Sequence, residues 1–356
     1  MRVKTLSINN LRNICSAKIE IDPCLNCFIG DNGAGKTSVL EALAVLSKGR
    51  SFRSGQASSL IGPDAKHFQI VATIESKSKN LNQVGIERGN DSWTARCNGE
   101  NVTQLSQLTQ LLPYVLLEPG SHTLVSGSPD GRRKYLDWGV FHVKHDYLNL
   151  WRRYSRVLKQ RNAALRQSSH GVVESLNPQF IEFGERLSQA REEHVVLLNQ
   201  VLKEKLPIFS ETLSDMALAY RKGWTGDGLG EAIHASALRD QDRGLTHPGP
   251  HKADLYLSMQ GAPAKERLSR GEQKSMTAAM ILAQAQLIAE NGESPVLMLD
   301  DLSSELDRAH FEKVLASGLE LDAQILLTGT SLSANIKSLV EDPVVFHVEQ
   351  GTFSRD

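Results

Sequence analysis

The distribution of hydrophobic and polar positions predicts strands through the first third of the chain. Apolar or alternating runs of strand length are separated by turn residues, as at the polar turn Asn10–Asn13. Strands are predicted at 3–8, 17–21, 24–29, 68–75, 83–88, 93–97 and 114–117, and helices at 38–46 and 105–112.

The middle of the chain changes to helical periodicity. From about residue 129 to residue 206 there are few helix-breaking residues, and helices are predicted at 132–141, 146–167 and 178–205. The loop at 168–171 joins two long helices, which is typical of an antiparallel helical hairpin.

The last third alternates strands with helices. Strands are predicted at 216–221, 254–259, 295–299, 323–327 and 344–348, with helices from 274 to about 289 and from Arg308. This alternation predicts an α/β fold with a mainly parallel core.

The stretch between the strand at 24–29 and the helix at 38–46 has the G-x-x-x-x-G-K-[ST] pattern of a phosphate-binding P-loop. Its backbone N–H groups and the helix dipole would point at one anionic group. Lys36 would reach the β- and γ-phosphates, and the Thr37 hydroxyl would bind Mg²⁺. An ordinary glycine-rich turn is the alternative, but the flanking strand and helix favour the P-loop. The loop consists of Gly30, Asp31, Asn32, Gly33, Ala34, Gly35, Lys36, Thr37 and Ser38.

Two carboxylates follow the apolar strand at 295–299. Asp300 is expected to hold Mg²⁺, directly or through water, and Asp301 to orient or deprotonate the attacking water. Two acids after a strand are a weak signal alone and a strong one together with Lys36.

Residues 269–274, here called the signature segment, place a serine and a glycine at the start of a helix. The hydroxyl, the N–H groups and the dipole would form a second anion site, which makes sense if it closes on ATP held by another subunit. The alternative is an ordinary N-cap in which Glu272 completes a capping box with Ser269. The segment is Ser269, Arg270, Gly271, Glu272, Gln273 and Lys274.

These motifs resemble those of the ABC/SMC-type ATPase heads, and within them the RecF family of recombination mediators. The resemblance rests on Arg12-Asn13, the P-loop, the signature segment and residues 299–307. Segments 49–53, 127–138 and 249–255 support the narrower family, and 141–206 is far too short for an SMC coiled coil. The implied fold is a P-loop ABC-type ATPase head, with a mixed sheet and flanking helices, plus a mainly helical arm domain. The expected boundaries are 1–140 and 244–356 for the ATPase domain, and 141–243 for the inserted arm.

The resemblance implies an ATP- and Mg²⁺-dependent homodimer with slow, DNA-stimulated ATP hydrolysis. Lys36 and Asp301 would be catalytic, Thr37 and Asp300 would bind the metal, and residues 269–273 of the signature segment would act in trans. Arg12 and Asn13 would be further nucleotide contacts, and the dimer seam would include Ser303, Ser304, Glu305 and Asp307. The family binds double-stranded and gapped or junction DNA and works with RecR and RecO to load RecA in DNA repair.

Three positions depart from the pattern of transporter ATPases. No histidine follows the strand at 323–327, where Thr328 stands instead; Glu118-Pro119 occupies the place of the expected glutamine; and the second acid is an aspartate, where transporters have a glutamate. We therefore assign no residue to the glutamine or histidine roles.

Local clusters of basic residues are the candidates for DNA contact, because the net charge of −1 does not indicate nucleic-acid binding. Residues 147–173 contain no acidic residue and carry Arg152, Arg153 and Arg156. A solvated helix face is the ordinary meaning of such a run. The other candidates are Arg50, Arg53, Arg132 and Arg133.

Composition is that of an ordinary globular protein, with 40% hydrophobic and 23% charged residues. No stretch approaches the ~18 uncharged apolar residues of a membrane span, and the N-terminus lacks a signal-peptide core, so a cytoplasmic location and no membrane partner are expected.

Cys24 and Cys27 have the spacing of half a zinc site, but we expect buried cysteines on a strand. Two other functions stay open: the ATPase subunit of an ABC transporter, and a P-loop homologue that binds nucleotide without turnover.

Overall fold

The computed structural model describes residues 1–53, 57–90, 92–302, 305–331, 336–340 and 343–356. The chain forms two compact units: unit 1 is Met1–Ser121 with Ile281–Asp356, and unit 2 is His122–Met280. These units divide the chain at other positions than the predicted domain boundaries. The reason is that α4 (Pro129–Val143) packs on the long helix α6 (His170–Phe209) and on β10 (Asp254–Met259). The functional domain boundaries stay a prediction.

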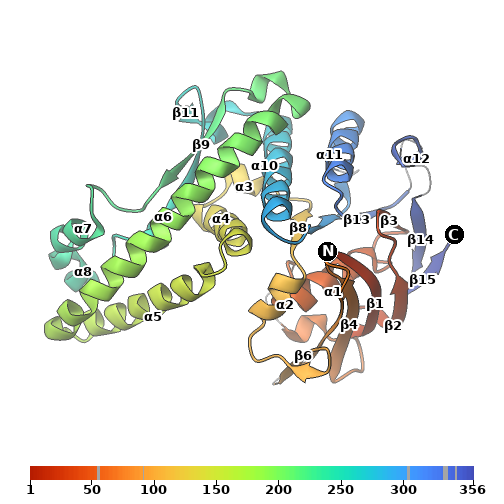
Figure 1. The fold of residues 1–356 in the computed structure, drawn as a ribbon, viewed down its shortest axis with the longest axis horizontal. Helices are drawn as coiled ribbons and strands as arrows, with labels where there is room; N and C mark the ends of the chain where they lie inside the picture. Colours follow the sequence, from red (N-terminus) through yellow and green to blue (C-terminus); the bar gives the residue numbers. More distant parts are fainter. Residues whose placement is uncertain (54–56, 91, 303–304, 332–335, 341–342) are drawn as a thin grey trace. The chain divides into compact units, whose positions relative to one another are not determined.

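The first sheet of unit 1 is antiparallel, with strand order β2-β1-β4-β5-β6-β7. Figure 1 labels its strands β1, β2, β4 and β6. Alternate side chains of β4 are buried, the period-two pattern of a sheet with one face on the core, whereas the pattern of β1 is interrupted where its register shifts between Val3 and Thr5. The strands are β1 (Arg2–Leu11), β2 (Ile14–Glu20), β4 (His67–Glu75), β5 (Leu81–Gly89), β6 (Trp93–Cys97) and β7 (Glu100–Asn101).

The second sheet of unit 1 has the order β15-β14-β3-β13-β12-β8 and is parallel except for β15. Strands β3, β12 and β13 are buried at every residue, as expected for parallel strands covered on both faces. The strands are β3 (Leu25–Ile29), β8 (Tyr114–Leu117), β12 (Val296–Leu299), β13 (Ile325–Gly329), β14 (Val344–Glu349) and β15 (Thr352–Arg355).

Helix α1 (Lys36–Lys48) is the central helix of unit 1. Nearly all of its side chains are buried, because it packs against β13 of the parallel sheet and against β1, β4 and β5 of the antiparallel sheet. Its N-terminus follows the carboxyl end of β3, where ligands bind in open α/β sheets. The other helices assigned wholly to unit 1 are η1 (Ala57–Leu60), α2 (Ser106–Leu111), α11 (Arg308–Glu320) and α12 (Ile336–Leu339).

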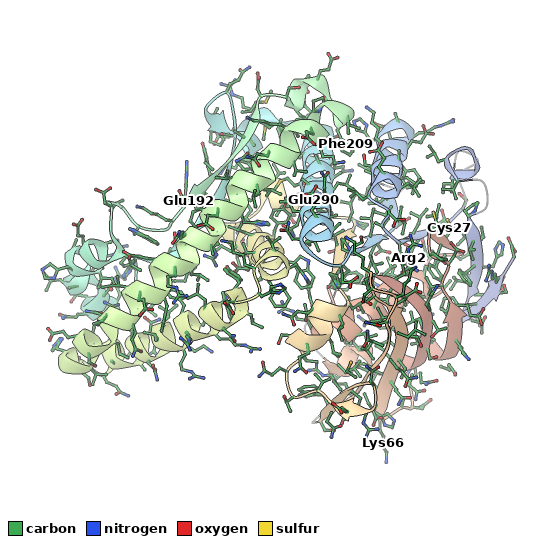
Figure 2. All side chains as sticks on the ribbon, in the orientation of Figure 1. Arg2, Cys27, Lys66, Glu192, Phe209 and Glu290 are labelled. Atoms are coloured by element: carbon green, nitrogen blue, oxygen red, sulfur yellow. The ribbon has the colours of Figure 1, made fainter. Side chains whose placement is uncertain are left out.

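Unit 2 contains the predicted helical hairpin, in which α5 (Tyr147–Arg166) and α6 run side by side (Figure 1). Helix α6 begins at His170, earlier than predicted, and so includes Pro178 within the helix. Glu192 projects from its exposed face and Phe209 is buried near its end (Figure 2).

A three-stranded antiparallel sheet, in the order β11-β10-β9, completes unit 2. The short helices of unit 2 were not anticipated in the sequence, because elements of three to seven residues have too little periodicity to detect. The remaining elements of unit 2 are α3 (Thr123–Ser126), η2 (Glu211–Leu213), β9 (Met216–Arg221), α7 (Leu229–Ala235), α8 (Ala237–Arg243), η3 (Pro250–Lys252), β11 (Ala262–Pro263) and α9 (Ala264–Arg267). Helix α10 (Arg270–Asn291) begins in unit 2 and ends in unit 1.

The interpretation of the two neighbouring cysteines needs a correction. Cys27 lies on β3 and is buried (Figure 2), but Cys24 precedes the strand and is exposed, because Asp22 and Pro23 form the turn that delays the strand to Leu25. The described residues contain no cluster of three or more side chains suited to holding a metal ion. Within the same residues, no helix combines the length and apolarity needed to cross a bilayer.

Candidate nucleotide-binding site

The P-loop connects the end of β3 to the start of α1, as the sequence predicts. Two glycines are required by its geometry. A Cβ on Gly30 would lie 2.2 Å from the Val348 carbonyl oxygen of β14, and Gly35 has φ +115°, a left-handed conformation that side chains disfavour. The backbone can therefore turn tightly enough to aim its N–H groups outward.

The N-terminus of α1 is left open to a ligand. No side chain caps it in the described part of the chain, and its first turn carries no acidic residue. Lys36 is buried, and its ammonium group donates to the carbonyls of Gly30 (2.8 Å) and Asp31 (2.9 Å). A lysine has three N–H donors, so one remains for an anion while the other two hold the loop. The arrangement suits a phosphate chain.

Three oxygens meet at the carboxyl ends of β12 and β13. The hydroxyls of Thr37 (2.8 Å) and Thr328 (2.7 Å) both donate to the same carboxylate oxygen of Asp300. Strand β13 lies between β3 and β12, which explains how Thr328 reaches Asp300. Thr328 is buried and orients the acid, a role that sequence reasoning left undecided.

The Thr37 hydroxyl and the Asp300 carboxylate fit a magnesium ion. Mg²⁺ prefers oxygen ligands and is commonly bound by one or two protein oxygens together with substrate phosphates. These two oxygens are adjacent and lie at the helix that would hold the phosphates. The pair would thus supply the protein's share of the coordination.

Asp301 lines the same cavity as the P-loop. Its backbone N–H donates to the Thr328 hydroxyl (3.0 Å), and its φ is +46°. This left-handed conformation separates the directions of the two neighbouring carboxylates, so that Asp300 faces Thr37 and Asp301 borders the cavity.

A cavity of about 920 Å³ surrounds the P-loop. Asn13, one of the two further predicted contacts, braces the loop, because its side-chain amide donates to the carbonyls of Gly33 (3.1 Å) and Ala34 (3.0 Å). Sequence reasoning did not anticipate the wall formed by 59–63. The lining residues are Arg12, Asn13, Asn32, Gly33, Gly35, Lys36, Thr37, Ser38, Arg53, Ser59, Ile61, Pro63 and Asp301.

Glu118, at the place of the missing glutamine, has an unusual environment. Burial and the negative charge of Asp300 raise its pKa to about 7, while Arg53 opposes the shift. It follows β8, whose last residue pairs with the end of β12. The acid therefore titrates near neutral pH beside the proposed metal ligand.

The signature segment adopts the capping-box geometry. The Ser269 hydroxyl and N–H both donate to the Glu272 carboxylate (2.8 and 2.9 Å), and the Glu272 N–H donates back to the hydroxyl (3.3 Å). Hydrogen bonds from Ser269 hold the pKa of Glu272 below its usual value. Ser269, Arg270 and Gly271 are exposed, whereas Gln273 is buried and bonds to the Leu268 carbonyl. The segment is thus accessible, with its serine hydroxyl already in use.

The predicted dimer seam is described only in part, because Ser303 and Ser304 lie outside the described residues. Asp307 caps α11 by accepting the His310 N–H (2.9 Å), which lowers the pKa of Asp307. Glu305 donates its N–H to the Leu302 carbonyl (3.0 Å). The role of these residues in a dimer stays a prediction.

Two of the basic candidates for DNA contact serve inside unit 2. Arg132 is buried and forms a bidentate ion pair with Asp254 (2.7 and 3.0 Å), so we assign it a structural role and correct the prediction. Arg133 is half-buried and donates to the Ala253 carbonyl (2.8 Å). In the run 147–173, Arg161 is likewise buried and pairs with Asp240.

The other basic candidates are exposed. Arg152, Arg153 and Arg156 lie on α5, where every exposed charged residue is cationic. Arg50 and Arg53 follow α1 in unit 1. These two groups keep the accessibility that a contact with phosphate requires.

The sequence matches the RecF/RecN/SMC N terminal domain family over residues 2–352. It is 39% identical over 363 residues to the DNA replication and repair protein RecF of Xanthomonas axonopodis pv. citri, covering 100% of this chain and 99% of that one. It is 40% identical over 359 residues to the protein of the same name from Thioalkalivibrio sulfidiphilus, covering 99% of both chains.

Solved structures share the fold. The structure of the recombination mediator protein RecF with ATP superposes with a TM-score of 0.88 at 24% identity, over 99% of this chain and 97% of that one. An SMC head bound to the C-terminal winged-helix domain of ScpA gives 0.60 at 13% identity, over 100% and 98%. The mixed α/β ATPase-head fold is thereby confirmed. From this sequence and structural agreement along the whole chain, we conclude that the protein belongs to the RecF family of DNA replication and repair proteins.

Proposed function

We propose that the protein is an ATP-dependent, DNA-binding recombination mediator that dimerises on binding ATP and hydrolyses it slowly. The observation that carries the proposal is the P-loop cavity in unit 1, which Lys36, Thr37 and Asp301 line and where Asp300 accepts the Thr37 hydroxyl. The solved RecF structures with ATP and family membership support the same choice of nucleotide.

ATP binding would place its phosphates at the N-terminus of α1. Backbone N–H groups and the Lys36 ammonium would neutralise the β- and γ-phosphates, and Mg²⁺, which offsets phosphate charge, would be held by Thr37 and Asp300. Asp301 would accept the proton of the water that attacks the γ-phosphorus, as the bond to the ADP oxygen breaks.

Dimerisation would use the signature segment of a second copy. The segment lies in unit 2, whereas the P-loop lies in unit 1, and its exposed residues Ser269, Arg270 and Gly271 are accessible to a partner. Each γ-phosphate would add contacts across the interface that ADP lacks, so hydrolysis would release the dimer.

The DNA partner is double-stranded and gapped or junction DNA, contacted through the exposed arginines of α5 and of the turn after α1. The arginines of α5 are exposed and have no acidic neighbour on the same helix. Such guanidinium groups can bind the phosphate backbone of DNA, and such contacts do not depend on base sequence. In the cell, the chain would act with RecO and RecR to promote RecA loading in repair and replication restart.

The transporter alternative is not favoured. Thr328 stands where a transporter has its histidine, and its hydroxyl is turned to Asp300. A homologue without turnover is disfavoured by the assembled acids at the cavity. The family relatives are named for DNA replication and repair.

Sedimentation of the full-length protein with ATP, ADP or no nucleotide tests the proposal. We expect a dimer with ATP but not with ADP or without nucleotide. Ser269→Arg should lose that dimer, because a large side chain would fill the space where the partner's phosphate binds. The matched control is Asp301→Asn, which keeps the phosphate contacts and should keep the dimer. An ATP-dependent dimer of unchanged strength in Ser269→Arg would contradict the proposal.

A further inference from the structure

A fully buried carboxylate on α1 bonds to Arg12, one of the residues that line the candidate nucleotide cavity. Glu41 has none of its surface exposed, and Arg12 donates to it through Nε (3.1 Å) and Nη2 (2.7 Å). A buried carboxylate needs a cationic partner with matching hydrogen bonds, and the planar guanidinium supplies two. The pair therefore fixes the plane of the Arg12 guanidinium.

Arg12 is held on a second side as well. Its Nη1 donates to the Ser59 carbonyl (2.5 Å), so three of its five N–H donors are in use in the described part of the chain. The remaining donors belong to a side chain that is about a quarter exposed and lines the P-loop cavity. Glu41 and the Ser59 carbonyl thus hold Arg12 while leaving two of its N–H donors for an anion.

The same carboxylate reaches the basic turn after α1. The Ser51 hydroxyl donates to Glu41 Oε1 and accepts the N–H of Arg53 (2.9 Å). Arg53 is exposed and lines the cavity as well, and Arg50 precedes it on the same turn. One buried acid therefore connects a predicted nucleotide contact with two candidate DNA contacts.

We propose that Glu41 is a positioning residue that links nucleotide binding to DNA binding in this protein. It orients Arg12 for the triphosphate and, through Ser51, fixes the turn that carries Arg50 and Arg53. Nucleotide in the cavity and DNA at the turn then stabilise the same network, so each ligand strengthens the binding of the other. The link rests on the function proposed above.

The first test measures the affinity of the full-length protein for a fluorescent ATP analogue without DNA. Glu41→Gln keeps the shape of the side chain but presents an amide where Arg12 needs a second acceptor, so we expect about tenfold weaker binding. The control is Ser47→Ala, which removes another buried hydrogen bond of α1, to the Leu112 carbonyl, and should stay within about twofold of wild type. Unchanged or tighter binding by Glu41→Gln would overturn the proposal, since Glu41 would then only neutralise charge.

The second test uses Ser51→Ala, a mild change that leaves the Arg12–Glu41 pair in place and keeps the test valid should Glu41→Gln not fold. We measure the anisotropy of a labelled gapped duplex with and without a slowly hydrolysed ATP analogue. In Ser51→Ala, ATP affinity should change by less than about twofold. The ratio of DNA affinity with the ATP analogue to DNA affinity without it should fall by about threefold or more. A full gain in the variant overturns the link. If the wild type shows no gain, the proposed function and the link both fail, but the ATP affinity of Glu41→Gln still decides whether Glu41 positions Arg12.

Discussion

The P-loop and the signature segment share a local architecture, but among the described residues the helix N-terminus is uncapped at the first and capped at the second. Each is a turn with glycine and a hydroxyl residue at the start of a long helix. At the P-loop, no described side chain caps the helix, and the open N-terminus faces a cavity of about 920 Å³. At the signature segment, Glu272 already occupies the Ser269 hydroxyl and N–H.

This difference implies an order of events under the proposed function. The P-loop is ready for phosphate in a single copy of the chain. The signature segment must exchange the hydrogen bonds of Glu272 for those of a phosphate that carries like charge. ATP would therefore bind first to the P-loop, and the dimer would form only when the γ-phosphate compensates the displaced cap.

The largest expected effect is the loss of ATP affinity when the P-loop lysine is removed. Lys36→Ala removes the ammonium and its two bonds to the loop carbonyls, so ATP affinity should fall by about a hundredfold, the effect of losing roughly 3 kcal/mol of charge-assisted contacts. Calorimetric titration at a protein concentration that keeps the chain monomeric measures this. The matched change at the signature segment, Arg270→Ala, should leave monomer affinity unaltered; an equal loss in both variants would refute the difference between the sites.

A smaller effect should follow from weakening the cap at the signature segment. Glu272→Gln keeps the capping geometry but removes a negative charge from a helix N-terminus, which should cost about 0.5 kcal/mol in urea unfolding. The same loss of charge should strengthen the ATP-dependent dimer by about threefold in sedimentation. The control is Glu266→Gln, a change at an exposed residue of α9. A weaker dimer in Glu272→Gln would mean that its carboxylate supports the interface.

The smallest effect is a difference between the two sites in how melting temperature depends on pH. The pKa of Glu118 is raised to about 7, so its favourable contribution is present below the ordinary carboxyl pKa and is lost as pH rises towards 7. Glu118→Gln should therefore melt about 2 °C above wild type at pH 8, with the gap narrowing at pH 5.

The pKa of Glu272 is lowered, so its contribution is lost only as pH falls below the ordinary carboxyl range. The melting difference between Glu272→Gln and wild type should thus stay level from pH 5 to 8. His194 and His251, whose pKa values burial lowers to about 4, titrate in every variant and cancel in these differences. Parallel curves for Glu118→Gln and Glu272→Gln would contradict the opposite shifts.

The local geometry of the candidate nucleotide site was readable in the sequence. The glycine spacing at 30–35 specifies a tight turn, and strand β8, which flanks the site, has the predicted bounds Tyr114–Leu117. Such features depend on residues close together in the chain, where spacing determines geometry.

The partners of charged side chains were not readable. Arg132 lies 122 residues from Asp254, and Arg12 lies 29 residues from Glu41, so nothing local distinguishes a buried ion pair from a solvated charge. The same holds for Thr328 and Asp300, which meet only when β13 is placed between β3 and β12. The raised pKa of Glu118 likewise depends on burial that no window of sequence reveals.

The left-handed backbone at Asp301 has a consequence for how this protein can change by mutation. Aspartate and asparagine tolerate a φ of +46° better than most other residues do, so the aspartate at this position suits the turn. A single base change converts aspartate to asparagine and would leave the turn undisturbed. Under the proposed function, a form that binds ATP but does not hydrolyse it is therefore one mutational step from the wild type.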